Sequence, residues 1–270
     1  MFSKNFISFL KEAQFTFEIL ASGITQLGKV NYAKKGLYFT SFTSISTGLE
    51  RIGKICLILD YCIRNNGDYP SAKTLKNDIG HDLQELYKKS KEIISHFDFK
   101  LNYLQDLEDP IYIEILSILS NFAKGDRYSN IDFLVNKNPK NDPIKDWYLK
   151  VDQVLFEKRV SQAQKDKIKF NSEMAGRILD GLSIVQHLSE TGLELNDIET
   201  SSYQTGVASA VAKYRQLYTL HIIRYWVDLL RELQYVAYNK KLDIPHFSEI
   251  FAIFNNEDSY LLTRKTFERL

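Results

Sequence analysis

SISTGLERIGKICLILDYCIR, residues 44–64, carries an apolar side chain at every third or fourth position. This spacing places those side chains on one face of a helix with about 3.6 residues per turn. The predicted face consists of Ile45, Leu49, Ile52, Cys56, Leu59 and Ile63. Asn65-Asn66-Gly67 follows and is typical of a helix end. We therefore predict one long helix over residues 37–64.

The same spacing continues on both sides of this segment. Upstream, the predicted apolar face runs through Phe6, Leu10, Ala13, Phe17, Leu20 and Ile24. Downstream we predict helices over about 80–96, capped by Asp78, from Pro110 onward, over 147 to about 187, and over 206–239. Strand-like alternation is nearly absent, and we find no internal repeat. The sequence therefore predicts an all-α protein, an antiparallel helical bundle extended by further long helices.

A polar stretch, VNKNPKNDPIKD at 135–146, is the best candidate for a linker. It divides the chain into a helical bundle over 1–135 and a helical region over 145–270. We expect the second region to pack on the first, either as a separate unit or as part of the same domain.

The composition predicts a soluble cytoplasmic protein. The net charge of +1 creates no overall field that would attract nucleic acid or a membrane surface. Cys56 and Cys62 lie in an apolar run and are typical of buried thiols in a reducing compartment. Lys4 and Lys11 interrupt any signal-peptide core, and the apolar run 52–63 is shorter than the roughly 20 residues that span a bilayer. We expect no contact with a membrane.

The motifs of common metal and nucleotide sites are missing from the sequence. It contains no Glu-x-x-His, no His-Glu-x-x-His, no Cys-x-x-Cys pair and no G-x-x-x-x-G-K-[ST] loop. We therefore expect neither a metal ion nor a cofactor.

A titratable pair stands at the start of one predicted helix, in NDIGHDLQEL at residues 77–86. One interpretation is structural, because Asp78 can cap the helix while Asp82 and Glu85 complement its positive end. The other is functional, because His81 changes its charge near neutral pH and can transfer protons.

Three fragments occur in order on successive predicted helices: SISTGLERIGKICLIL (44–59), IGHDLQELYKKSKEI (79–93) and FAKGDRYSNIDFL (122–134). Together they resemble a HEPN domain, a helical module of prokaryotic toxin–antitoxin, abortive-infection and other defence proteins. The resemblance covers about residues 36–135 and rests mainly on G-L-E-R-x-x-K and G-H-D-L-x-x-L. It implies a protein of a bacterial defence or toxin system that acts on RNA and pairs as a homodimer or with a partner protein of that system.

Active members of that family are metal-independent ribonucleases with an Arg-x(4–6)-His motif. In such a site His transfers a proton, and Arg holds the scissile phosphate and its developing charge. The corresponding segment here has Arg127 but no following histidine. His81 and Arg127 are therefore the candidate catalytic residues. The formal match RQLYTLH offers Arg215 and His221 as an alternative pair, although these residues lie about 120° apart around a helix, and a core histidine is the ordinary interpretation.

The polar residues of the three fragments also suit a phosphate pocket, if their helices converge. Glu50 and Lys54 lie one helical turn apart, and Asp82 stands at a helix start, where backbone N–H groups favour anions. The candidate binding residues are Glu50, Lys54, Asp82, Tyr128 and Asn130. The alternative is a solvated Glu50–Lys54 pair and a helix-end cation at Arg127. On that interpretation the protein is a non-catalytic binding or assembly module.

Overall fold

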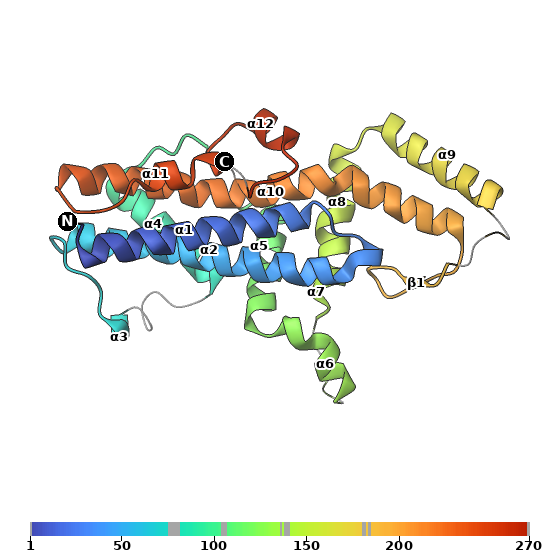
Figure 1. Ribbon diagram of the computed structural model, residues 1–270, viewed down its shortest axis with the longest axis horizontal. Coiled ribbons are helices and arrows are strands. Elements are labelled where there is room, and N and C mark those ends of the chain that lie inside the picture. Colours follow the sequence, from blue (N-terminus) through green and yellow to red (C-terminus); the bar gives the residue numbers. More distant parts are fainter. Residues whose placement is uncertain are drawn as a thin grey trace.

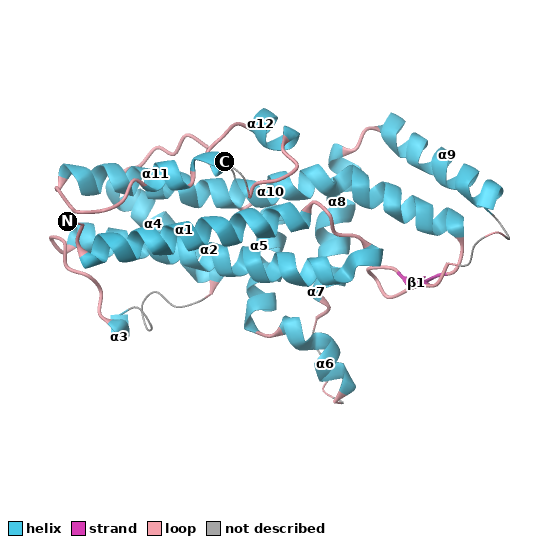
Figure 2. Ribbon diagram, viewed as in Figure 1, coloured by secondary structure: helices cyan, strands magenta, loops and turns pink. Residues whose placement is uncertain are grey.

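The computed structural model describes residues 2–74, 82–103, 107–135, 137, 141–179, 182 and 185–268, and they form helices almost throughout (Figures 1 and 2). The all-α prediction is confirmed. The helical elements are α1 (Lys4–Leu27), η1 (Tyr32–Lys34), α2 (Lys35–Arg64), α3 (Ala72–Thr74), α4 (Leu83–Phe97), α5 (Pro110–Lys124), η3 (Asp126–Tyr128), α6 (Ser129–Leu134), α7 (Pro143–Trp147), the π-helical turn η4 (Tyr148–Asp152), α8 (Gln153–Arg159), α9 (Gln162–Leu179), α10 (Ile198–Asn239), α11 (Phe247–Ile250), η5 (Ala252–Phe254) and α12 (Asp258–Thr263). Two short strands, β1 (His187–Leu188) and β2 (Glu194–Leu195), pair antiparallel.

The three longest helices, α1, α2 and α10, lie side by side along the long axis of the molecule (Figure 1). Helices α1 and α2 are antiparallel, because Gly23 lies against Ile45 and Gly48 against Leu20. A Cβ atom at Gly48 would come within 2.5 Å of the Leu20 side chain, so the absent side chain lets the two helices approach closely.

Helix α10 runs in the same direction as α2. The Cys56 thiol lies 3.7 Å from the carbonyl oxygen of Trp226, and the Lys240 ammonium donates to the carbonyl of Ile63 at 2.8 Å. The face of α2 predicted from its apolar spacing is the face that these neighbours bury, with Ile45, Leu49, Ile52, Cys56, Leu59 and Ile63 at most 2% exposed.

Two aspartates fix the starts of α4 and α5. The Asp82 carboxylate accepts from the backbone N–H of Gln84, and the Asp109 carboxylate accepts from that of Ile111. Helix α5 begins at Pro110, as predicted. Helix α4 begins at Leu83, later than the predicted start near residue 80, and Asp82 is its cap; Asp78 lies outside the described residues.

The predicted single helix over 147–187 is wrong. Helix α8 ends at Arg159, and Val160 adopts an extended conformation. A new helix, α9, begins at Gln162, and the Ser161 hydroxyl before it accepts from the backbone N–H of Gln164 at 3.4 Å. The strands β1 and β2 then form a hairpin where the prediction had a helix end. Helix α10 begins at Ile198, before the predicted start at residue 206, and Asp197 caps its first turn.

Both halves of the chain contribute to one hydrophobic core. Phe42 of α2 contacts Trp147 of α7 with ring centroids 5.0 Å apart, and the α10 side chains Leu229 and Leu233 are completely buried. The region 145–270 therefore packs on the bundle. Among the described residues, we find no helix that combines the length and apolar character needed to cross a bilayer.

Candidate functional site

A polar cavity of about 370 Å³ opens where α2 meets the start of α4 and the end of α5. Its walls are Thr43, Ser46, Thr47, Glu50, Asp82, Phe122, Ala123, Lys124 and Arg127. We call it the α2–α4–α5 cavity. Three of the candidate residues, Glu50, Asp82 and Arg127, come from the three resembling fragments and line this one cavity.

Helix α2 provides the hydroxyl and carboxylate side of the cavity. Glu50 accepts from the ammonium of Lys54 at 2.7 Å, with their side chains 25% and 19% exposed. Thr47 lies one turn before Glu50 along the same wall. Lys54 is placed by this ion pair beside the cavity, although it lines a separate groove with Phe9.

Asp82 joins α4 to α5. Besides capping α4, its carboxylate accepts from the Ser120 hydroxyl at 3.1 Å and from the Lys124 ammonium. Partial burial raises the pKa of Asp82, but the hydrogen bonds from Lys124, Gln84 and Ser120 outweigh burial, so the pKa lies below its usual range. The carboxylate is therefore ionised at neutral pH and its charge is matched by Lys124.

Arg127, in η3 directly after α5, supplies a positive charge to the cavity lining. Its guanidinium lies over the Tyr128 ring, 5.1 Å from the ring centroid, and the residue is exposed. Within the part of the chain that the structure describes, no carboxylate forms an ion pair with Arg127. Glu50 and Asp82 each have a lysine partner, so Arg127 is the cation that can offer its charge to an anion in the cavity.

Besides Lys54, two further candidate binding residues do not line this cavity, and His81 falls outside the described residues. Asn130 lines a neighbouring cavity of about 340 Å³ with Asp142 and Lys145. Tyr128 is 49% exposed beside Arg127. His81 lies outside the described residues, but it directly precedes Asp82 in the chain.

Lys124 and Thr47 belong to the cavity and were missed by the sequence analysis. The signal at Lys124 was its place at the end of α5, where a cation complements the helix dipole. The signal at Thr47 was its position one turn before Glu50 in the resembling fragment.

Comparison with protein-family models, curated proteins and solved structures found no match to this chain.

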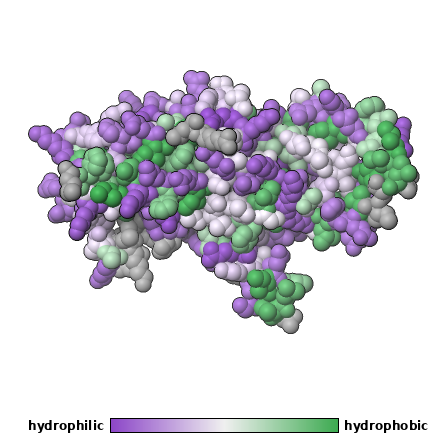
Figure 3. Space-filling model, in the orientation of Figure 1, coloured by the Kyte–Doolittle hydropathy of each residue, from purple (hydrophilic) through white to green (hydrophobic). Residues whose placement is uncertain are grey.

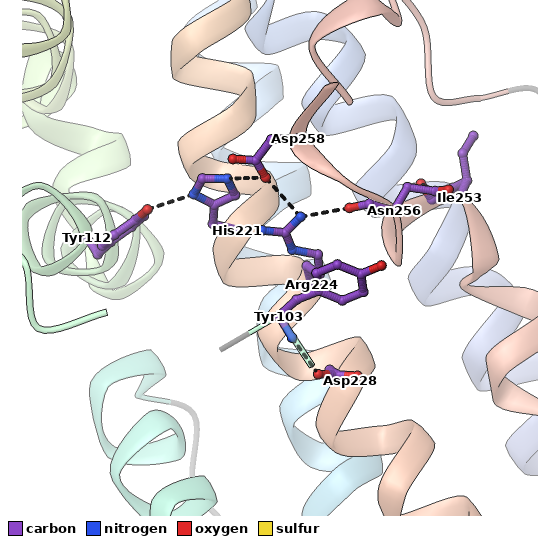
Figure 4. A network of polar contacts seen from close by, with 8 residues as sticks. All are labelled: Tyr103, Tyr112, His221, Arg224, Asp228, Ile253, Asn256 and Asp258. Atoms are coloured by element: carbon purple, nitrogen blue, oxygen red, sulfur yellow. Dashed lines mark hydrogen bonds and ion pairs between the residues drawn. The ribbon is translucent and has the colours of Figure 1, made fainter. Parts of the chain in front are cut away.

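A second polar cluster joins α10 to the C-terminal segment (Figure 4). His221 lies between Tyr112 of α5 and Asp258 of α12, with its Nδ1 2.7 Å from the tyrosine hydroxyl and its Nε2 3.0 Å from the carboxylate. The carboxylate can only accept, so Nε2 carries the hydrogen and the Tyr112 hydroxyl donates to Nδ1. Burial lowers the pKa of His221 to about 4, even though Asp258 acts to raise it. The imidazole is therefore neutral at pH 7.

Arg224 carries the positive charge of this cluster. It lies 2.9 Å from Asp258 and donates to the carbonyl of Asn256 at 2.7 Å, while its guanidinium covers the Tyr103 ring at 4.7 Å (Figure 4). The Arg224 side chain is 1% exposed. The contacts of Asp258 with His221 and Arg224 hold α12 against α10, and they support a structural role for His221.

Arg215, the proposed partner of His221, faces a different set of groups. Its guanidinium lies 3.3 Å from Asp152 and donates to the carbonyl of Ala208 at 3.0 Å. Arg215 has 0% exposure and His221 3%. The two residues have separate partners, so the structure does not bring this alternative pair together at a surface.

Proposed function

We propose that the α2–α4–α5 cavity binds the phosphate groups of RNA, in a HEPN-like protein of a bacterial defence or toxin system. The observation that carries this proposal is the convergence of Glu50, Asp82 and Arg127 on one cavity from three separate helices. This convergence supports the phosphate-pocket interpretation, which needs polar residues of the three fragments to lie together.

The charges around the cavity leave one cation available for an anion. The lining carries two carboxylates, Glu50 and Asp82, and two cations, Lys124 and Arg127. Lys124 pairs with Asp82, and Lys54, from beside the cavity, pairs with Glu50, so the charge of Arg127 is available. A guanidinium binds phosphate through two parallel N–H donors, which makes arginine well suited to this position. The Thr47 hydroxyl of the α2 wall adds a donor for a further phosphate oxygen.

The observations also favour a second function, metal-independent RNA cleavage. Asp82 lines the cavity and His81 precedes it directly in the chain. A histidine that transfers a proton beside a phosphate held by Arg127 would supply the chemistry of a ribonuclease. The non-catalytic alternative is an RNA-binding or assembly module that uses the cavity without cleavage.

Binding can be tested with a fluorescein-labelled single-stranded RNA. We expect fluorescence anisotropy to show binding by the wild-type chain and at least about tenfold weaker binding by Arg127→Ala, because a charge-assisted phosphate contact is lost. Lys137→Ala is the matched control, because Lys137 is exposed, pairs with Asp132 and does not line the cavity. Equal weakening by both variants would indicate non-specific attraction and would overturn the assignment of the cavity.

Cleavage is tested separately, with gel analysis of the same RNA in excess chelator. The ribonuclease proposal predicts cleavage that persists in chelator and falls by about 10²- to 10⁴-fold in His81→Ala, the usual contribution of a general acid or base. Binding without cleavage identifies the non-catalytic module. Circular dichroism of each variant confirms that the helices are retained.

A further inference from the structure

A groove of about 380 Å³ lies between the first half of α1 and the second half of α2. We call it the α1–α2 groove. Figure 3 shows apolar patches among polar side chains over the end of the molecule where α1 begins. The volume of the groove falls within the range of about 300–1,000 Å³ that is typical of small-molecule sites.

The floor of the groove is apolar. Phe9 of α1 and Ile55 of α2 line it and are 6% and 1% exposed. The Phe9 ring lies between two other rings, with centroid distances of 5.7 Å to Tyr69 and 5.6 Å to Phe247 of α11. Phe247 is buried, so its contact holds the Phe9 ring in place. The floor is therefore a fixed part of the fold, and it can bind the apolar body of a ligand.

Glu12 and Arg51 close one end of the groove. Nη1 of Arg51 donates to Oε1 of Glu12 at 2.6 Å, and both side chains are 39% exposed. Within the described part of the chain, the Arg51 guanidinium makes no other hydrogen bond, so its Nε and Nη2 donors can bind a ligand. Two parallel donors of this kind match a carboxylate.

The charges of the lining also favour an anionic head group. Two cations, Arg51 and Lys54, and one carboxylate, Glu12, line the groove. Lys54 pairs with Glu50, which lines the α2–α4–α5 cavity instead. Arg51 therefore provides the charged contact, and Lys54 adds a positive charge nearby.

The length of the groove limits the size of the ligand. Helices α1 and α2 are antiparallel, so Asn5 and Ile58 mark the end of the groove opposite Glu12 and Arg51. The two ends are two helical turns apart, or about 10 Å. An extended chain of about eight carbon atoms has this length. One leaflet of a bilayer has a hydrocarbon layer of about 15 Å, so the groove fits a free medium-chain ligand better than a membrane lipid.

We propose that the α1–α2 groove binds an amphiphilic anion, a medium-chain carboxylate in its simplest form. The carboxylate binds Arg51, and the apolar chain lies over Ile55 and Phe9 toward Ile58. These residues do not line the α2–α4–α5 cavity, so the site does not depend on the proposed RNA binding.

Isothermal titration calorimetry of the full chain with sodium octanoate tests the proposal. We expect one site per chain with a Kd below about 1 mM, a reasonable affinity for a ligand of this size. Acetate has the head group alone, and octylammonium has the same chain with the opposite charge. Both should bind at least about tenfold more weakly, because each lacks one of the two contacts. Equal binding of octylammonium, or no binding of octanoate at about 10 mM, would overturn the proposal.

A charge variant tests the head-group contact. Arg51→Gln should weaken octanoate binding at least about tenfold, because a charge-assisted contact is lost. Arg64→Gln is the matched control, since Arg64 also lies on α2 and pairs with a carboxylate, Asp60, but does not line the groove. It should bind octanoate as the wild type does.

A filling variant tests the location without removing a core side chain. Ser8 lines the groove and is exposed, and its hydroxyl donates to the carbonyl of Lys4. Ser8→Trp should occupy the groove and abolish octanoate binding. Gln14→Trp, at an exposed position of α1 outside the lining, should leave binding unchanged. Circular dichroism of each variant checks that the helices are retained. Octanoate binding that survives both Ser8→Trp and Arg51→Gln, or that the two controls weaken equally, would overturn the assignment of the groove.

Discussion

Arg215 and Asp152 form an ion pair inside the core, with Nε of Arg215 3.3 Å from Oδ1 of Asp152 and their side chains 0% and 2% exposed. The pair joins α10 to the π-helical turn η4, where Asp152 also accepts from the indole N–H of Trp147 at 3.1 Å. Burial raises the pKa of Asp152 to about 6, and the guanidinium opposes that rise. The residue considered as an alternative catalytic arginine is thus the partner of a buried carboxylate.

The first prediction concerns this pair. Arg215→Met leaves the Asp152 carboxylate buried without its cation, and we expect the free energy of unfolding to fall by about 3–5 kcal/mol at pH 8 in urea titrations. The loss should be smaller at pH 5, where Asp152 carries a proton. The double variant Arg215→Met/Asp152→Asn should be more stable than Arg215→Met alone, because the buried charge is gone. A single variant as stable as the wild type would show that the pair contributes nothing.

The second prediction concerns His221 and pH. Its pKa is about 4 in the folded chain and about 6.5 in an unfolded chain. The unfolded chain therefore binds the proton first as the pH falls, so stability is complete above pH 6.5 and is lost progressively toward pH 4. The free energy of unfolding falls by at most about 3 kcal/mol through this group.

His221→Gln isolates this contribution, because glutamine keeps a donor and an acceptor but does not titrate in this range. Asp152 contributes in the opposite direction between about pH 4 and 6, since its pKa is raised in the folded chain to about 6. The measured quantity is therefore the difference in the free energy of unfolding between wild type and His221→Gln, from urea titrations at pH 4 to 8. If that difference does not change with pH, His221 is not held neutral.

Local patterns in the sequence predicted the long helices well. The apolar face of α2 follows from the spacing of residues such as Leu49, Ile52 and Cys56, because a side chain at the helical period is buried whichever neighbour covers it. The start of α5 at Pro110 follows from a residue preference of the same local kind.

The break between α8 and α9 was predictable in part. Ser161 and Gln164 have the spacing of a capping box, but good helix-forming residues stand on both sides, and the helical pattern masked the boundary. The partners of Arg215 were not predictable from local patterns. Asp152 lies in a different element, and only the packing of α10 against η4 brings the two together.

The third prediction concerns the docking of α9 on α10. A Cβ atom at Gly206 would lie 2.6 Å from Cγ2 of Ile168, so we expect Gly206→Ala to displace α9. We expect a loss of about 1–3 kcal/mol, which exceeds the helix-propensity gain of about 1 kcal/mol. Gly36→Ala is the control, because no atom lies within 4 Å of its added Cβ position and only the gain remains.

Hydrogen exchange followed by mass spectrometry checks this prediction at the level of the helix. Gly206→Ala should accelerate exchange in peptides from α9, whereas peptides from α2 should exchange as in the wild type. Unchanged protection of α9 would mean that Ile168 adjusts its rotamer without displacing the helix.

The last prediction separates the two roles of Asp82, which caps α4 and also neutralises Lys124 in the α2–α4–α5 cavity. Asp82→Asn keeps a good cap and should change the free energy of unfolding by less than about 1 kcal/mol, whereas Asp82→Ala should cost about 1–2 kcal/mol.

Both changes remove a negative charge from the cavity and release Lys124 to bind an anion. We therefore expect Asp82→Asn to bind the labelled RNA severalfold more tightly than the wild type, with an affinity that falls more steeply as salt rises. The measurement is fluorescence anisotropy at several salt concentrations, beside urea titrations of all three chains. If Asp82→Asn leaves both the affinity and its salt dependence unchanged, the phosphate groups bind elsewhere, and Asp82 serves only to cap the helix.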